Sequence, residues 1–147
     1  MGTHYQGKPG EVRALDTFIK LVRSADTVSS RLNRRLGTLE LTESQFGVLE
    51  ALHHLGPLCQ RALAEKLLRT GGNLTLVVDN LEKRGLVRRE RDEADRRFVT
   101  VHLTPAGRKL IEAIFPGHVR AIVDELGGLT AAEQEELGRL CRKLGKR

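Results

Sequence analysis

The sequence predicts a mainly α-helical fold with one small β-hairpin. Apolar residues recur at steps of three and four along most of the 147 residues, which is the spacing of amphipathic helices. Helix-capping residues precede several of these stretches, and glycine or proline follows them. Only the region near residues 86–103 alternates apolar with polar residues, as a pair of short strands does.

The first two helices are expected over residues 11–40 and from Thr42 onward. The first has a wide apolar stripe, too long to be buried by its own chain, that consists of Leu15, Phe18, Ile19, Val22, Ala25, Leu32, Leu36 and Leu39. Thr42 and Gln45 form a capping box for the second helix, and Gly56-Pro57 ends it.

Two short helices are expected next, on either side of a glycine-containing turn. The third begins near Gln60, and its apolar face consists of Leu63, Ala64, Leu67 and Leu68. The turn is predicted at Thr70-Gly71-Gly72-Asn73, and Gly85 ends the fourth helix, whose apolar residues are Leu74, Val77, Val78 and Leu81. This is the helix-turn-helix pattern, in which the second helix enters the DNA major groove.

A hairpin follows the fourth helix. Leu86-Val87 predicts a short strand and residues 88–97 a charged loop, and the returning strand contains Val99, Val101 and Leu103. A helix-turn-helix followed by a hairpin is a winged helix, so residues 42–103 are predicted to form a DNA-binding lobe.

Two more helices are expected over residues 104–145. Thr104-Pro105 starts the first, Pro116-Gly117 should kink or break it, and Gly127-Gly128 should end it. Thr130 with Glu133 opens the last helix. These helices and the one over residues 11–40 carry apolar stripes that so small a domain cannot bury, which predicts dimerisation. A two-fold dimer would place two recognition helices in successive major grooves, about 34 Å apart.

The composition limits the classes of molecule that the protein is expected to bind. A net charge of +6 and a pI of about 9.8 suit a polyanion, whereas only 3% aromatic residues and no Trp argue against stacking on single-stranded RNA. We find no transmembrane or signal-peptide pattern, which predicts a cytoplasmic protein without membrane partners. Cys59 and Cys141 lack disulfide or metal-ligand spacing, so free thiols and no metal or other cofactor are expected.

The stretch from Leu74 to Gly107 resembles the signature of the MarR family of bacterial and archaeal winged-helix regulators. The matching residues are Leu81-Glu82, Gly85-Leu86-Val87, Asp95-Arg96-Arg97, Thr104 and Gly107. The helix order is similar as well, so the resemblance covers nearly the whole chain and implies one MarR-like domain over residues 1–147. Leu76 and Asn80 depart from the family, where Arg or a small polar residue is common at the first position and Arg at the second. Base preference therefore does not carry over, and contact of Leu76 with thymine methyl groups is one substitute.

Candidate DNA contacts cluster at the start of the recognition helix. They are Thr70, Gly71, Gly72, Asn73, Thr75 and Leu76. Small polar groups and free N–H donors at a positive helix end suit phosphates and base edges, and Asn73 can bind adenine. The residues alone favour capping by Thr70 and Asn73, whereas the resemblance favours DNA contact.

A second group of candidates lies in the wing. Residues 88–97 contain five Arg and four acidic residues, which by themselves favour a solvated hairpin. The resemblance implies that Arg96, or else Arg97, enters the minor groove while Asp95 orients its neighbours. Gln60 and Arg61 are candidates for phosphate contact, with an ordinary exposed helix as the alternative.

Cysteine and histidine provide weaker candidates. Cys59 precedes the third helix, where the positive helix end and Arg61 would favour a reactive thiolate, although an inert buried thiol fits the residue type better. Cys141 fits an interface or core. One residue of the His53-His54 pair is expected to line a core or pocket, and no catalytic or metal-binding motif is visible.

We therefore expect a homodimeric, sequence-specific transcriptional regulator and not an enzyme. The resemblance implies a repressor that leaves a pseudo-palindromic operator when a small phenolic or other aromatic ligand changes the spacing of its DNA-binding lobes. The DNA-bound form would be nucleoid-associated. Two alternatives stay open: an oxidant or electrophile sensor acting through Cys59, and a winged helix used for protein interaction. The sequence does not specify the pocket residues.

Overall fold

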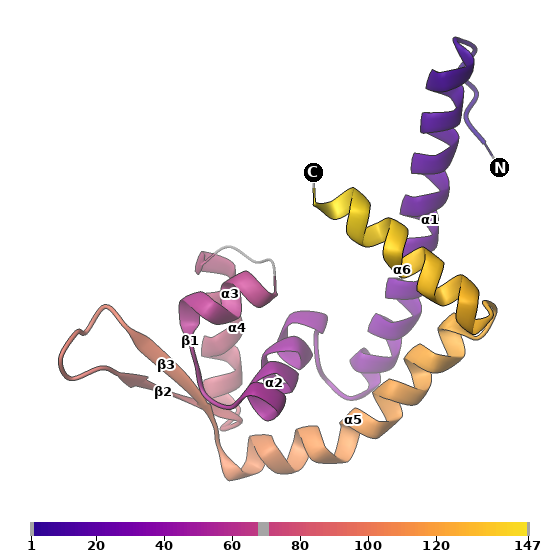
Figure 1. Ribbon diagram of the computed structural model, residues 1–147. Coiled ribbons are helices and arrows are strands. Elements are labelled where there is room, and N and C mark those ends of the chain that lie inside the picture. Colours follow the sequence, from indigo (N-terminus) through magenta and orange to yellow (C-terminus); the bar gives the residue numbers. More distant parts are fainter. Residues whose placement is uncertain (1, 68–70, 147) are drawn as a thin grey trace. The chain divides into compact units, whose positions relative to one another are not determined.

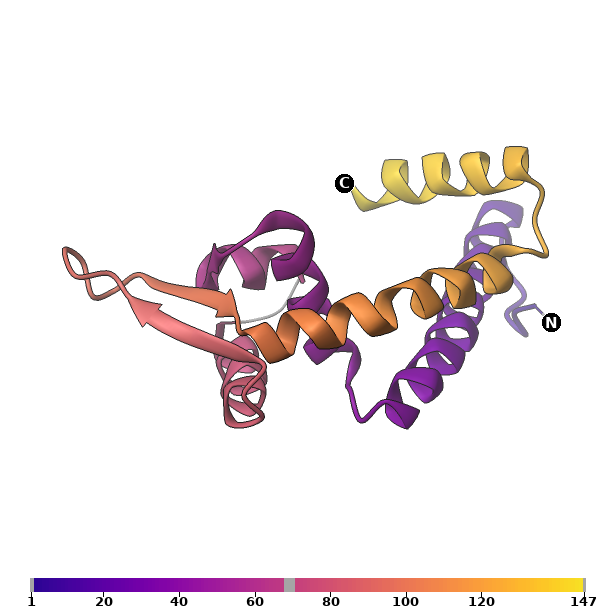
Figure 2. The same cartoon turned by 90° about the horizontal axis from the view of Figure 1, so that it is seen from below.

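The computed structural model describes residues 2–67 and 71–146, and the chain divides into two compact units between Glu40 and Leu41. The elements appear in Figures 1 and 2. The helices are α1 (Pro9–Thr38), α2 (Glu43–Leu55), α3 (Gln60–Lys66), α4 (Gly71–Lys83), α5 (Pro105–Leu126) and α6 (Ala131–Gly145). The strands are β1 (Leu58–Cys59), β2 (Val87–Arg91) and β3 (Val99–Leu103). The fold is thus mainly helical with a small sheet, as predicted.

The N-terminal unit consists mainly of α1. It begins two residues earlier than expected, because Pro9 occupies the first helical position, where its missing N–H breaks no helical hydrogen bond. The carboxylate of Glu11 accepts a hydrogen bond from the Lys8 backbone N–H at 3.2 Å, which satisfies an end donor. Part of the predicted apolar stripe is exposed, including Leu15, Phe18 and Val22.

The helix-turn-helix begins with α2, where the predicted capping box is confirmed. The Thr42 hydroxyl accepts from the Gln45 N–H at 3.1 Å, and the Gln45 side chain accepts from the Thr42 N–H at 3.0 Å. Gly56 ends the helix with a φ of 78°, a left-handed value that favours glycine.

The predicted turn before α4 is wrong in its extent. Gly71, Gly72 and Asn73 lie inside the first turn of α4, whereas Leu68 and Thr70 fall outside the described residues. The apolar face of α4 is buried as expected, since Leu74, Val78 and Leu81 are each 0% exposed.

The wing belongs to a three-stranded antiparallel sheet with the order β1-β3-β2, not to a simple hairpin. Strand β2 continues to Arg91 through residues predicted as loop, because it pairs with β3 along its full length, with Arg89 opposite Val101 and Arg91 opposite Val99. Strand β1 was not predicted, since its two residues are too few to show alternation.

Of the kink or break predicted at Pro116-Gly117, the break does not occur. The helix runs continuously from Pro105 to Leu126, and side chains on both sides of Pro116 pack against α2. The Phe115 ring lies 4.7 Å from the His54 ring, and the His118 ring lies 4.2 Å from the Phe46 ring. Tertiary contacts therefore hold a helix whose local sequence favours interruption.

The C-terminal helix α6 has the predicted capping box, formed by Thr130 and Glu133. Each N–H donates to the other residue's side chain, at 2.9 and 3.2 Å. Apolar side chains are exposed on both α5 and α6: Val119, Ile122, Val123, Leu137, Leu140 and Leu144. Among the described residues, no helix has the length and apolar character needed to cross a membrane.

Candidate nucleic-acid interface

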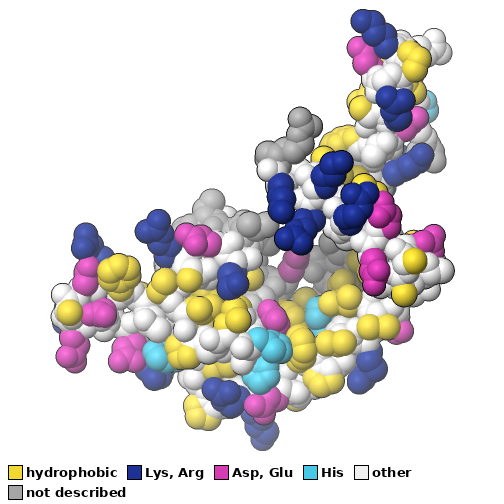
Figure 3. Space-filling view, viewed as in Figure 1, with side chains coloured by type: hydrophobic (Ala, Val, Ile, Leu, Met, Phe, Trp, Pro, Cys, Tyr) yellow, Lys and Arg dark blue, Asp and Glu magenta, His cyan; other side chains and the backbone are white. Residues whose placement is uncertain are grey.

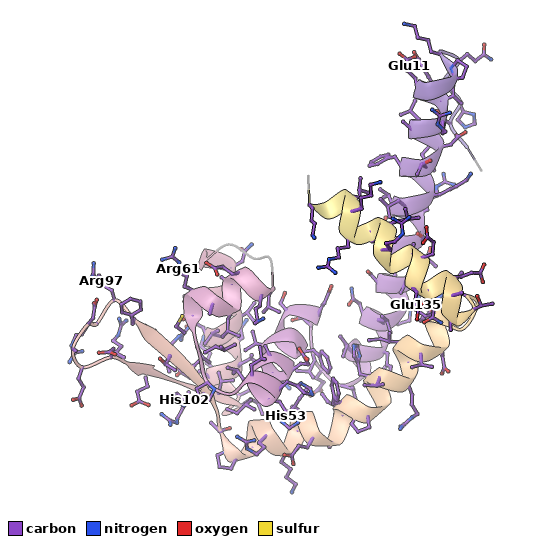
Figure 4. The ribbon with its side chains drawn as sticks, viewed as in Figure 1. Glu11, His53, Arg61, Arg97, His102 and Glu135 are labelled. Carbon is purple, nitrogen blue, oxygen red and sulfur yellow. The ribbon has the colours of Figure 1, made fainter. Side chains whose placement is uncertain are left out.

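Basic side chains of α3 and of the wing tip, the loop of residues 92–98 between β2 and β3, lie on one side of the C-terminal unit. In Figure 4, Arg61 and Arg97 extend from the same side of the sheet, whereas His102 lies on the opposite side. Figure 3 shows acidic side chains gathered lower on the wing. On the His102 side lies a shallow cavity of about 360 Å³, lined by Glu90, Arg91, Asp92, Glu93, Thr100 and His102. Its carboxylates oppose phosphate binding, so a polyanion is favoured on the Arg61 side.

The recognition helix α4 directs one face to the core and the other to solvent. Leu76 follows the buried Leu74 by two residues, which is about 200° around a helix, and its side chain is 62% exposed. Asn73 and Thr75 are also exposed, on the first two turns. The helix thus presents two polar side chains and one apolar side chain to whatever binds its outer face.

Hydrogen bonds centred on Asp95 order the wing tip. Its carboxylate accepts from the Arg97 backbone N–H at 3.1 Å, and from the guanidinium at 3.0 and 2.8 Å. The side-chain hydrogen bonds, followed by the backbone one, lower the pKa of Asp95 below its ordinary value. The same pairing raises the pKa of Arg97. The predicted role of Asp95 in orienting a neighbour thus applies to Arg97.

Arg96 differs from Arg97 in its partners. The backbone carbonyl of Arg96 accepts from Arg91 at 3.0 Å, while its own guanidinium makes no hydrogen bond or ion pair to any described residue. Phe98 follows, with a side chain that is 53% exposed. Its backbone closes the loop, because its N–H donates to the Asp95 carbonyl and its carbonyl accepts from the Asp92 N–H. The tip therefore carries Arg96, a cation that pairs with no described residue, and the exposed ring of Phe98 two residues further on. The sequence did not indicate Phe98 as a candidate.

Comparison with known proteins places this arrangement in a family. A model of the MarR family matches residues 41–99. The HTH-type transcriptional regulator YkoM of Bacillus subtilis is 34% identical over 133 residues, which cover 90% of this chain and 86% of that protein. The chain belongs to the MarR family. It is a DNA-binding transcriptional regulator, and its relatives are regulators and not enzymes.

Solved structures show the same architecture. Sco3205 of Streptomyces coelicolor, a MarR-family regulator in complex with DNA, has a TM-score of 0.86 at 26% identity and is matched over 99% of this chain and 92% of that one. BpsR of Bordetella bronchiseptica has a TM-score of 0.80 at 29% identity, with 88% and 98% covered. The DNA binding of BpsR is regulated by 6-hydroxynicotinic acid.

In this MarR-family chain, two of the predicted DNA contacts bind each other. The Gln60 amide, at the start of α3, donates to the Thr75 hydroxyl at 2.8 Å and accepts from Arg89 at 3.2 Å. Arg61 differs, since its side chain is 87% exposed and its ion pair with Glu65 is long, at 3.6 Å. Of the two α3 candidates, Arg61 is therefore the more available to a phosphate.

Arg89 was not identified from the sequence, which placed it in a charged loop. Two signals could have identified it. Arg89 is two residues after Val87, so in a strand the two side chains share one face, and Val87 is buried. Asp79 and Glu82 lie three residues apart on the recognition helix and so form one acidic patch. A basic residue is expected opposite such a patch.

The cysteine and histidine candidates lie on separate elements. Cys59 is half-buried and caps α3, because its Sγ accepts from the Ala62 N–H at 3.4 Å. Cys141 is exposed on α6. His53 is half-buried, and its Nδ1 is buried without a hydrogen-bond partner among the residues that the structure describes. Among the described ranges, no three His, Cys, Asp or Glu residues form a group suited to a metal ion.

Proposed function

We propose that this MarR-family regulator binds a pseudo-palindromic operator as a homodimer and represses transcription until a small aromatic ligand releases it. The observation that carries the proposal is the position of Arg96, Arg97 and the outer face of α4 on one lobe. The α4 face would enter the major groove and the wing tip the adjacent minor groove, where the negative potential attracts arginine. The DNA complex of Sco3205, which has the same fold, supports this docking.

Within the recognition helix, Asn73 and Leu76 have separate roles in the proposal. Asn73 can bind adenine through its amide, and Leu76 can contact thymine methyl groups. Gly71 and Gly72 let the backbone of the first turn approach a phosphate closely. Thr70 belongs to the same proposal but lies outside the described residues.

The homodimer rests on the exposed apolar side chains of α1, α5 and α6. Leu137, Leu140 and Leu144 recur at steps of three and four along α6, and they are between 43% and 56% exposed. A single chain that leaves such a stripe in water gains by covering it with a second copy. Light scattering of the purified protein should give twice the mass of 16.4 kDa, and a monomer would contradict the dimer.

Release by a ligand would work through the spacing of the two lobes. An operator fixes the distance between its half-sites, so a ligand that changes the lobe spacing weakens binding in both grooves together. Regulation of BpsR by 6-hydroxynicotinic acid supports an aromatic ligand as the first class to screen. A second trigger is favoured by one observation, that the Cys59 thiol caps α3 beside Gln60. Cys59→Ser retains a capping group, so normal oxidant-induced release by this variant would exclude the thiol trigger.

The test is binding to the DNA upstream of the protein's own gene, across a salt series and with excess non-specific competitor. Wild type should show competitor-resistant binding whose logarithm falls linearly with the logarithm of salt concentration. Arg96→Ala should weaken binding and reduce the slope by about 0.9 for each phosphate that is no longer neutralised. Arg88→Ala is the matched control, because Arg88 is paired with His102 on β3, on the side of the sheet away from Arg61. This variant should retain the affinity and the salt slope of wild type. A winged helix used for protein interaction predicts no specific binding and no effect of either substitution.

A further inference from the structure

Arg89 links the wing to both helices of the helix-turn-helix. From β2, its guanidinium donates to the Gln60 amide oxygen at 3.2 Å and to the Thr75 backbone carbonyl at 2.9 Å. The same group pairs with the carboxylates of Asp79 and Glu82, and the Arg89 backbone N–H donates to Glu82 at 2.9 Å. The side chain is 20% exposed, so these interactions are only partly screened by water.

These interactions join three separate elements through one planar group. Gln60 begins α3, while Thr75, Asp79 and Glu82 follow one another along α4 over two turns. Arg89 itself is fixed in the sheet, where it is paired with the buried Val101 on β3. The five N–H donors of a guanidinium have fixed directions, so satisfying several acceptors at once restricts the angle between wing and helix.

The neighbouring Arg88 lacks this role. It lies on the other face of β2, its side chain is 55% exposed, and its ion-pair partner is Glu90, at 3.0 Å on the same strand. Arg88 therefore has the charge of Arg89 and nearly the same place in the chain without the same links to the helices. The pair provides an internal control.

We infer that Arg89 is a positioning residue for DNA recognition, which fixes the wing relative to the recognition helix without itself touching DNA. The inference rests on the proposed operator binding, in which α4 must occupy the major groove while the wing tip of the same lobe occupies the minor groove. A wing that moves relative to α4 would leave one groove whenever the helix engages the other. Arg89 also neutralises Asp79 and Glu82, which would otherwise repel phosphates beside α4.

The first experiment compares Arg89→Gln and Arg88→Gln on the operator fragment that wild type binds. We expect Arg89→Gln to weaken specific binding at least tenfold, because a wing that is not held against α4 loses its contacts in the minor groove while the helix occupies the major groove. Arg88→Gln should stay within twofold of wild type. Unchanged binding by Arg89→Gln would overturn the inference. Arg96→Ala should cost little further affinity in the Arg89→Gln background, because a displaced wing has already lost that contact, and a full additional loss would show that Arg89 acts independently of the wing and would also overturn the inference.

A second comparison separates geometry from charge. The double variant Arg89→Gln/Glu82→Gln restores the local net charge but not the planar set of N–H donors of the guanidinium. Its affinity for the operator should therefore remain low. Arg89→Lys keeps the charge on a single ammonium that cannot reach all four partners, and it should also bind weakly. Recovery of wild-type affinity in either variant would show that charge alone matters and would overturn the positioning role.

Hydrogen exchange without DNA makes the inference independent of the operator. Arg89→Lys, the variant that best preserves folding, should exchange faster than wild type at the amides of β2, β3 and α4 while α2 and α5 keep their protection. Equal protection throughout would overturn the inference. If wild type binds no operator, the proposed function fails, but this exchange pattern still decides whether Arg89 holds the wing.

Discussion

Gly107→Ala should destabilise this protein although alanine is the better helix former. Gly107 lies in the first turn of α5 and is buried against the start of β2. A Cβ there would overlap the backbone carbonyl oxygen of Leu86, would lie 2.9 Å from its carbonyl carbon, and would come within 3.2 Å of a Leu103 methyl. That carbonyl oxygen also accepts the Thr104 N–H at 3.1 Å. Relief of the overlap therefore requires backbone movement at the base of the wing.

The expected magnitude follows from three opposing effects. Replacing glycine by alanine inside a helix gains about 1 kcal/mol. Forcing a methyl group against backbone costs about 3 kcal/mol, near the upper end for overpacking. Weakening the Thr104 hydrogen bond costs about 1 kcal/mol more. The net loss is about 3 kcal/mol, or a fall in Tm of roughly 10 °C for a protein of this size.

Urea unfolding followed by circular dichroism, at one protein concentration for all variants, measures this loss. Gly138→Ala is the matched control, because Gly138 is also helical and no atom of residues 2–67 or 71–146 lies within 4 Å of its added Cβ. That substitution should leave stability unchanged or raise it by up to about 1 kcal/mol. A Gly107→Ala protein as stable as wild type would refute the argument that the α5–β2 packing excludes a side chain.

Three further predictions address capping, charge and base contact. Thr42→Ala should lower stability by about 1 kcal/mol in the same unfolding assay, whereas Thr42→Ser should not, and equal losses would show that the hydroxyl does not cap α2. Because Arg97 lowers the pKa of Asp95, the stability from this pair is fully present above the ordinary pKa of the carboxyl and is lost only as pH falls through the lowered value. A carboxyl titration by NMR should place the Asp95 midpoint below that of an unpaired aspartate, and a midpoint above it would contradict the pairing. Removing thymine methyl groups from the operator by uracil substitution should weaken wild-type binding by about 0.8 kcal/mol for each buried methyl, yet leave Leu76→Ala unaffected, and equal losses would exclude a methyl contact by Leu76.

Capping and periodicity made much of the fold predictable. The boxes at Thr42 and Thr130 each connect residues three apart, so the sequence alone locates the helix starts. The buried residues Leu74, Val78 and Leu81 follow from helical spacing in the same way. The candidate DNA surface was predicted in outline, although its wing residues depended on resemblance to a family, because the mixed charges of residues 88–97 suit a solvated loop equally well.

The remaining features depend on contacts between residues distant in the chain. Helix α5 is continuous across Pro116, although proline disfavours a helix locally. Phe115 and His118, on either side of it, pack on rings of α2. The hydrogen bond between Arg89 and Gln60 joins residues 29 apart, and no local pattern reports it. The sequence by itself determined where helices begin, which of their faces are apolar and the order of the winged helix, because those signals act within about four residues. Only the tertiary structure decided which wing arginine is held by Asp95, which one is uncommitted and which one ties the wing to the recognition helix, because chemically identical side chains differ only in what the fold places beside them.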